Sequence, residues 1–201
     1  MKYYAQINSH NILVGIDLGT LIEDEYGSSD VQNIEVSKEY YDNYQLYGSD
    51  YYIYDNGEIV VNPEYETTKL NEAKQAKYDE ANEKAREYLE SGEALYEFEE
   101  GKHIEATDGN IAKIGLKSTA LILAQDFTTT FPWNTKEDEN IFLNALTGKE
   151  VAEGLGVIQD EVWTVKFPNY LTQIDNAETV EEVEAIEINY NSNMEEENEI
   201  T

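Results

Sequence analysis

The chain has 201 residues, of which 40% are apolar and 28% charged, so it is long enough to bury a core of its own. Its 43 Asp and Glu residues against 13 Lys and Arg give a formal net charge of −30. We therefore expect no direct binding to nucleic acid or to a membrane surface, because both are recognised mainly by neutralising negative charge with Lys and Arg.

The acidity itself allows two interpretations. It keeps a protein soluble and monodisperse, or it attracts a basic partner and imitates nucleic acid. The absence of Cys excludes disulfides, thiolate zinc sites and cysteine nucleophiles, which fits a reducing cytosol. The start of the chain lacks the apolar core of a signal peptide, and no run of about 18 apolar residues predicts a membrane span.

Residues 1–62 are expected to form a small antiparallel β-module of short strands, and they hold ten of the sixteen tyrosines. Apolar residues alternate on both sides of Asn8 to Asn11, which predicts a hairpin. A second hairpin is predicted around Asp55-Asn56-Gly57, because Asn-Gly can supply the two positive φ angles of a type I′ turn.

The tyrosines of this module have two readings. Tyr favours strands and can cover one face of a thin sheet while its hydroxyl stays in water, or the rings form an adhesive surface. Tyr51, Tyr52 and Tyr54 are the candidate partner-binding residues of the second reading. Strand alternation would place Tyr52 and Tyr54 on one face and Tyr51 on the other.

Residues 63–92 predict one long linking helix, since Glu64 to Glu90 are rich in Ala, Glu and Lys and contain no Gly or Pro. Its apolar stripe consists mostly of alanine, which buries little area. Such a helix is suited to a spacer between two modules or to the seam of a homo-oligomer, so we expect proteolysis between the modules to release a folded C-terminal fragment.

Residues 93–190 are expected to form an α+β domain of hairpins and helices. Hairpins are predicted on either side of Glu99 to Lys102 and of Lys136 to Asn140. Thr107-Asp108 predicts a helix N-cap, and Ile111 to Ala124 is apolar on nearly every face, which indicates the helix at the centre of the core. We expect Trp133 to be substantially buried against that helix rather than to serve as a sugar-stacking platform.

Two further helices follow. Thr147-Gly148-Lys149-Glu150 predicts a capping box that opens a core-facing helix, which Pro168 should kink or end. Thr179 to Glu182 predicts a second capping box, and residues 191–201 are expected to be an acidic disordered tail.

The sequence contains no pattern that predicts catalysis. His10 and His103 belong to no short motif with a catalytic partner, and there is no phosphate loop or His-Glu-x-x-His pattern. The acidic run Glu23, Asp24 and Glu25 could hold calcium loosely or form a solvated face. We therefore predict no catalytic, cofactor or metal site, and we keep Glu23, Asp24 and Glu25 as candidate contacts to a basic partner.

Two parts of the sequence resemble small phage proteins. Met1 to Asn8, with Asn11-Ile12 and Gly15-Ile16, resembles the opening strands of tail-fibre assembly chaperones. The second part is similar to an uncharacterised phage tail domain that is appended to such proteins, through Ala76 to Ala85, Phe98 to Ala106, Trp133-Asn134-Thr135 and Ala177 to Val183. The resemblance spans roughly residues 1–188 and implies no catalytic residues.

The resemblance implies a non-enzymatic tail accessory or tail-fibre assembly protein that binds a phage tail or tail-fibre protein. It would act in the host cytoplasm during assembly or in the virion tail. The alternative hypothesis is an acidic, nucleic-acid-mimicking inhibitor of a host defence nuclease, whose binding would weaken steeply with salt. A third is a structural domain with a weak metal site.

Overall fold

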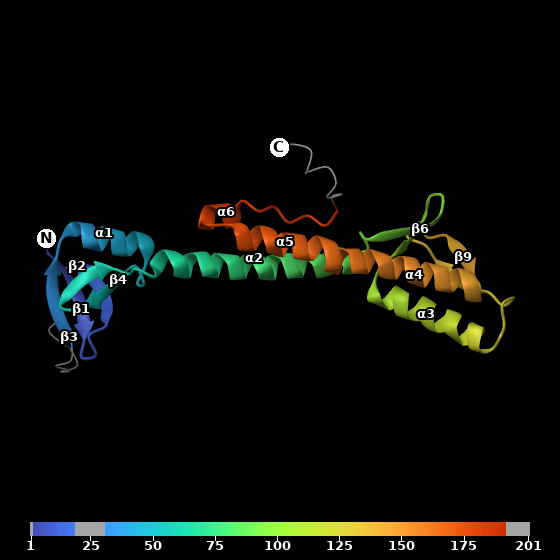
Figure 1. Ribbon diagram of the computed structural model, residues 1–201, viewed down its shortest axis with the longest axis horizontal. Coiled ribbons are helices and arrows are strands. Elements are labelled where there is room, and N and C mark those ends of the chain that lie inside the picture. Colours follow the sequence, from blue (N-terminus) through green and yellow to red (C-terminus); the bar gives the residue numbers. More distant parts are fainter. Residues whose placement is uncertain (1, 19–30, 192–201) are drawn as a thin grey trace. The chain divides into compact units, whose positions relative to one another are not determined.

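The computed structural model describes residues 2–18 and 31–191, which form a mixed α+β protein (Figure 1). The chain divides into two compact units, residues 1–71 (unit 1) and residues 72–201 (unit 2). The predicted fold class is confirmed: a three-stranded antiparallel sheet, a long helix, and then hairpins that alternate with helices. The boundary between the units falls inside the long helix α2 (Tyr65–Glu90), which the sequence analysis set apart as residues 63–92.

The sheet of unit 1 has β1 (Tyr3–Asn8) at its centre, between β2 (Leu13–Leu18) and β3 (Val31–Val36). Both pairings are antiparallel, and they place Ala5 opposite Ile16 and Ile34. The predicted first hairpin is therefore confirmed. Its turn is closed by Asn8, whose side-chain oxygen accepts hydrogen bonds from the backbone N–H groups of His10 and Ile12.

Helix α1 (Lys38–Tyr47) corrects the expectation that this module contains only short strands. Tyr40, Tyr44 and Tyr47 recur at spacings of four and three, the period of a helix face, and Tyr40 and Tyr44 pack on the core of the unit. This helical spacing was missed because tyrosine has a high β-propensity. In the folded chain, packing overrides that propensity. The helix ends at Gly48, whose φ of 93° favours glycine.

The second predicted hairpin is confirmed as β4 (Tyr52–Asp55) and β5 (Glu58–Val61). Asn56 and Gly57 have φ angles of 50° and 94°, as the Asn-Gly turn requires. Tyr52 and Ile59 from this hairpin join Ala5 and Ile16 from the sheet in the buried core of unit 1.

In unit 2, the remainder of α2 buries Ala81, Ala85 and Leu89. The alanine stripe is completely covered at Ala81 and Ala85, although each of these side chains offers little area. Helix α5 (Phe167–Asn176) and the segment after helix α6 (Val180–Glu184) run beside this part of α2 (Figure 1). Two hairpins complete the core, and both were predicted: β6 (Leu95–Glu99) with β7 (Lys102–Glu105), and β8 (Phe131–Asn134) with β9 (Asn140–Leu143).

Helix α3 (Asp108–Leu123) begins at the predicted N-cap, where Thr107 Oγ1 accepts a hydrogen bond from the Asn110 N–H at 3.2 Å. Its predicted place at the centre of the core is wrong. Only Ile114 and Ser118 are buried, whereas Leu116 and Leu123 are 73% and 79% exposed. The helix packs on one side only, where Gly115 lies beside Ala152 of α4 (Ala145–Glu161).

The start of α4 corrects the capping box predicted at Thr147 to Glu150. Asn144 is the N-cap: its side chain accepts from the N–H groups of Leu146 and Thr147, and Thr147 Oγ1 accepts from the Asn144 N–H. Thr147 is thus the third residue of the helix and closes the box that Asn144 opens. Asn is as good a cap as Thr, and the earlier start buries Ala145 and adds a turn to the helix.

Pro168 does not end the helical run that follows. Helix α4 continues through a π-helical turn, η1 (Val162–Lys166), into α5 (Phe167–Asn176), with Pro168 in the first turn of α5. Helix α6 (Val180–Glu184) starts at Thr179 as predicted, with Thr179 Oγ1 accepting from the Glu182 N–H, but the Glu182 carboxylate accepts from the N–H of Glu178 instead of Thr179.

Candidate functional site

Unit 1 contains a hollow of about 430 Å³ that is lined by two of the predicted site residues, Tyr52 and Tyr54. It lies between the β1–β2 turn, the residues from Ser49 into β4, and the first turns of α2. The lining residues are Asn11, Ile12, Leu13, Ser49, Asp50, Tyr52, Ile53, Tyr54, Asn62, Tyr65, Thr68 and Lys69. Aromatic and aliphatic walls with a few amide and hydroxyl groups are typical of sites that bind side chains of another molecule.

The three candidate tyrosines have different environments. Tyr52 belongs to the core at 5% exposed, and its hydroxyl accepts a hydrogen bond from Asn43 Nδ2 at 3.0 Å. Tyr54 is half-buried and lines the hollow next to Ile53. Tyr51 precedes β4 and does not line the hollow. Its ring stacks on that of Tyr47, with the ring centroids 4.4 Å apart. Glu23, Asp24 and Glu25 lie outside the described residues.

The sequence analysis missed part of this wall. Ile12 stands in a polar hairpin turn and is 57% exposed, although an apolar side chain there gains nothing for the fold. Its position in an Asn-Ile-Leu run was a usable signal. Tyr65 and Lys69 come from the start of α2, and the Lys69 ammonium lies 5.7 Å from the centroid of the Tyr65 ring. No local pattern links these helix residues to β4.

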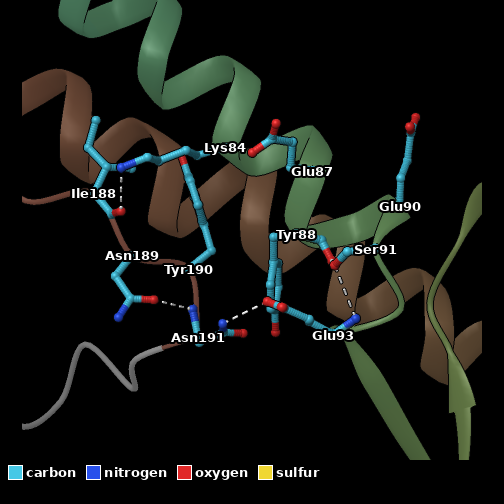
Figure 2. Close-up of a pocket in the computed structure, with 10 residues that line it drawn as sticks. All are labelled: Lys84, Glu87, Tyr88, Glu90, Ser91, Glu93, Ile188, Asn189, Tyr190 and Asn191. Carbon is cyan, nitrogen blue, oxygen red and sulfur yellow. Dashed lines mark hydrogen bonds between the residues drawn. The ribbon is translucent and has the colours of Figure 1, made fainter.

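Unit 2 has a second hollow, of about 580 Å³, where the end of α2 meets the segment from Ile188 to Asn191 (Figure 2). Its walls are carboxylates, amides and the faces of two tyrosines. Tyr88 and Tyr190 stack with centroids 6.3 Å apart, and Asn191 Nδ2 donates to a carboxylate oxygen of Glu93 at 2.8 Å. The residues in this hollow thus satisfy one another and hold the segment in place.

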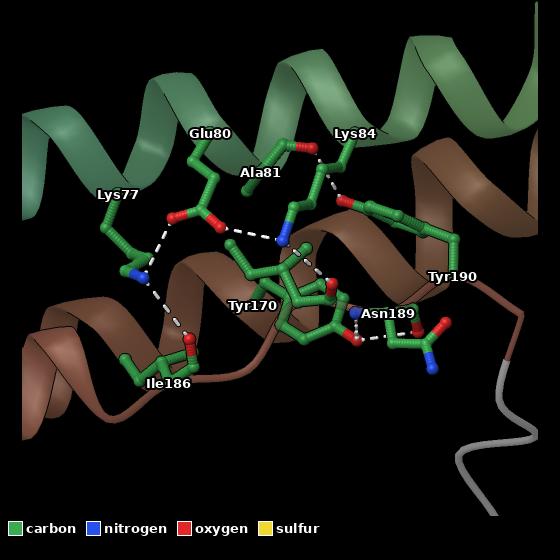
Figure 3. A network of polar contacts seen from close by, with 9 residues as sticks. Lys77, Glu80, Ala81, Lys84, Tyr170, Ile186, Asn189 and Tyr190 are labelled. Atoms are coloured by element: carbon green, nitrogen blue, oxygen red, sulfur yellow. Dashed lines mark hydrogen bonds and ion pairs between the residues drawn. The ribbon is translucent and has the colours of Figure 1, made fainter.

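The network around this segment explains where several lysines are used (Figure 3). Lys77, Lys84 and Lys166 donate to alternate backbone carbonyls, those of Ile186, Ile188 and Tyr190, at 3.3, 3.4 and 3.0 Å. Alternate residues of an extended chain face the same way, so one row of ammonium groups holds one edge of the segment.

Glu80 completes the row, since its carboxylate pairs with both Lys77 and Lys84 at 2.8 Å. The hydrogen bonds from Lys77 and then Lys84 lower the pKa of the Glu80 carboxyl. Tyr190 lies in the core at 3% exposed, donates to the Ala81 carbonyl at 3.0 Å, and has its pKa raised by burial. This arrangement binds a peptide segment of the protein itself and carries no reactive group.

One histidine does have a partner that the sequence did not reveal. His103 Nδ1 and the His103 backbone N–H both bond the Glu137 carboxylate, at 2.8 and 3.0 Å. The hydrogen bond from the His103 backbone N–H, and after it the one from the His103 ring, lower the pKa of the Glu137 carboxyl to about 2. The pair fastens the β8–β9 turn to β7, and 34 residues of sequence separate its members.

Within residues 2–18 and 31–191, no group of three or more His, Cys, Asp and Glu side chains could hold a metal ion. Over the same residues, no helix combines the length and the apolar character that crossing a bilayer requires.

Comparison of the chain with protein-family models, with curated proteins and with solved structures found no match.

Proposed function

We propose that this chain is a non-enzymatic accessory protein of a bacteriophage tail, which binds a tail or tail-fibre protein through the hollow of unit 1. The phage setting rests on the resemblance of residues 1–16 to tail-fibre assembly chaperones and of the later segments to an uncharacterised phage tail domain appended to such proteins. The observation that carries the binding role is the hollow itself, where Tyr54, Ile12 and Ile53 present aromatic and aliphatic surface on rigid strands and turns.

Two physical features of the hollow support this role. Tyr side chains supply much of the energy of protein interfaces, because a ring buries a large area at little entropic cost and its hydroxyl can still bond. Polar side chains also line the hollow, among them Asp50 and Asn62, and the Asn62 amide is held in place by hydrogen bonds to the Asp50 carbonyl and from the Glu64 N–H. A tail protein that inserts an apolar side chain between Ile12 and Tyr54 would therefore bury both without stranding a polar group.

The test is affinity capture of the tagged chain from phage-infected cells, with mass spectrometry of the partners. We expect the wild-type protein to retain a tail or tail-fibre protein. Ile12→Ser and Tyr54→Ser each remove a wall of the hollow and should lower its recovery at least about tenfold, since truncating an interface anchor costs about 2 kcal/mol or more.

Leu46→Ser is the matched control. Leu46 is 72% exposed on α1 and does not line the hollow, so this variant should capture the partner like the wild type. An equal loss in the control would indicate nonspecific binding to exposed apolar side chains. Undiminished capture by Ile12→Ser and Tyr54→Ser would contradict the proposed role of the hollow.

A second candidate function, the acidic inhibitor of a host nuclease, is favoured by one observation. Asp79, Glu83, Glu87 and Glu90 recur along one exposed face of α2 at spacings of three and four residues. Such a row of carboxylates could occupy a positively charged nucleic-acid channel.

The same capture experiment separates the two functions when it is repeated between about 0.05 and 0.5 M salt, a range over which screening shortens to a few ångströms. Capture of a fibre protein that resists salt supports the tail role. Capture of a nuclease that fades with salt, and that is lost when Asp79 and Glu83 are changed to Asn and Gln, supports inhibition.

A further inference from the structure

The lysines of this protein are not used alike. Most of them face a carboxylate within 4.0 Å: Lys2, Lys38, Lys77, Lys84, Lys102, Lys149 and Lys166. Lys113 and Lys117 have no such partner among the residues that the structure describes, although the chain carries 43 acidic residues. They stand one turn apart on α3, so both ammonium groups reach the same region of surface.

That region is a hollow of about 550 Å³ between α3, the end of β7 and the strand β8 with its turn. Its lining residues are Glu105, Asn110, Lys113, Lys117, Pro132, Trp133, Asn134, Thr135, Lys136 and Asp138. Three lysines against two carboxylates leave it with a net charge of +1, in a protein whose net charge is −30. A pocket of this size accommodates a small organic ligand.

Trp133 forms the aromatic wall of this hollow. It was expected to be substantially buried, and it is partly buried: the ring packs on the core of unit 2 and also lines the hollow. The Lys117 ammonium lies 5.6 Å from its centroid and 5.1 Å from that of Phe131. This contact holds a lysine charge at the hollow without cancelling it, because a ring attracts a cation and carries no net charge.

We propose that this hollow binds a sugar unit that carries one acidic group, with Lys113 and Lys117 facing the acidic group and the Asn134 amide and Trp133 facing the sugar. An ammonium pair with no carboxylate partner is matched by an anion. Amide groups both donate and accept, as sugar hydroxyls do, and the Asn134 side chain is exposed.

The charge of the whole protein restricts the ligand further. A polyanion would extend beyond the hollow, where the surrounding carboxylates would repel it. A single acidic group stays inside the hollow next to the lysines, and carboxylates more than about 8 Å away are screened from it at physiological salt. The ligand is therefore a mono- or disaccharide unit with one carboxylate or phosphate, and not a nucleic acid or a highly charged polysaccharide. This site is independent of the hollow in unit 1, and its failure would leave the proposed tail role untouched.

The experiment is a titration of the isotope-labelled full chain by NMR, with the Trp133 indole N–H and the amides of Lys113 and Lys117 as reporters. The probes are glucuronate, glucose 6-phosphate, glucose and inorganic phosphate at constant ionic strength. Saturable shifts at these reporters are expected with one or both acidic sugars, which also distinguishes a carboxylate from a phosphate. Affinity should be at least about tenfold lower for glucose and for phosphate alone, the equivalent of one charge-assisted hydrogen bond.

Variants complete the test. Lys113→Gln with Lys117→Gln should lower the affinity for the acidic sugars about tenfold and leave that for glucose unchanged, while Lys149→Gln on α4, outside the hollow, should change neither. The proposal is overturned if glucose binds as tightly as the acidic sugars, if inorganic phosphate does, or if the reporters do not move with any sugar while the rest of the spectrum shows a folded chain.

Discussion

The two units build their cores from different side chains. Unit 2 closes on aliphatic residues such as Ile104, Leu143 and Leu155, which are almost completely buried. Unit 1 has few fully buried side chains, and half-buried tyrosines surround them, among them Tyr40 and Tyr54. The difference means that unit 2 has a closed aliphatic core, whereas unit 1 leaves large aromatic surface partly exposed.

Tyrosine makes the thin core of unit 1 workable. Its ring packs, while its hydroxyl reaches a backbone carbonyl or water. Tyr40 donates to the Ile59 carbonyl at 3.3 Å, and Tyr65 donates to the Tyr47 carbonyl at 2.8 Å. These bonds fix the rings in place, with Tyr40 partly exposed and Tyr65 buried.

The largest effect is expected in the aliphatic core. Leu155→Ala should lower the unfolding free energy of unit 2 by about 2–5 kcal/mol, because Leu155 is fully buried and its loss leaves a cavity. Both tryptophans lie in unit 2, so fluorescence during denaturation reports this unit. Val157→Ala on the same helix, 65% exposed, should change stability by no more than about 0.5 kcal/mol. Similar losses in the two variants would refute the closed core.

A smaller loss is expected where a hydroxyl is buried. Tyr170 OH donates to the Asn189 carbonyl and accepts from the Asn189 N–H, both at 2.9 Å. Tyr170→Phe leaves both backbone groups without this partner and should destabilise unit 2 by about 1–3 kcal/mol in the same fluorescence measurement. Unchanged stability would mean that water replaces the hydroxyl and that the segment is held by other contacts.

In unit 1 the corresponding change should cost less. Tyr52→Phe removes only the hydrogen bond from Asn43, whose amide can turn to solvent, so we expect a loss of about 0.5–1.5 kcal/mol. Tyrosine circular dichroism during denaturation would follow this unit, since most tyrosines lie in it. A loss as large as that of Leu155→Ala would show that the tyrosine core is as closed as the aliphatic one.

The smallest effect concerns pH. The pKa of Glu137 is about 2 in the folded chain, below the ordinary value of about 4.3, so its stabilising contribution is present above pH 4.3 and is lost as the pH falls toward 2. A carboxyl NMR titration should give a midpoint well below 4. In His103→Ala the pKa should rise only part of the way, because the backbone N–H of residue 103 still donates. A midpoint near 4.3 in the wild type would contradict the His103–Glu137 contact.

Local signals in the sequence predicted much of this structure. Asn56-Gly57, Thr107 and Thr179 act through neighbouring backbone groups, so the hairpin turn and the two helix starts could be read directly. Helix α1 was missed because tyrosine favours strands, and the start of α4 was placed a turn late because Asn144 caps it ahead of Thr147.

The rest depends on contacts between distant residues. Nothing near His103 points to Glu137, and nothing near Lys77 points to the carbonyl of Ile186, 109 residues away. The candidate site was likewise only partly predicted. Tyr52 and Tyr54 were identified from an aromatic strand, but Ile12 and Tyr65 join them only after the hairpin turn and α2 have folded against that strand.

Hydrogen exchange of the chain, alone and with its captured tail partner, tests the central claim most directly. The account predicts slower exchange in the complex at residues 11–13 and 52–54, the strand and turn that form the hollow, with the amides of α2 from Asp79 to Glu90 unchanged. Protection confined to Asp79–Glu90, with residues 11–13 and 52–54 exchanging as in the free chain, would contradict it and assign the binding surface to the acidic face of α2.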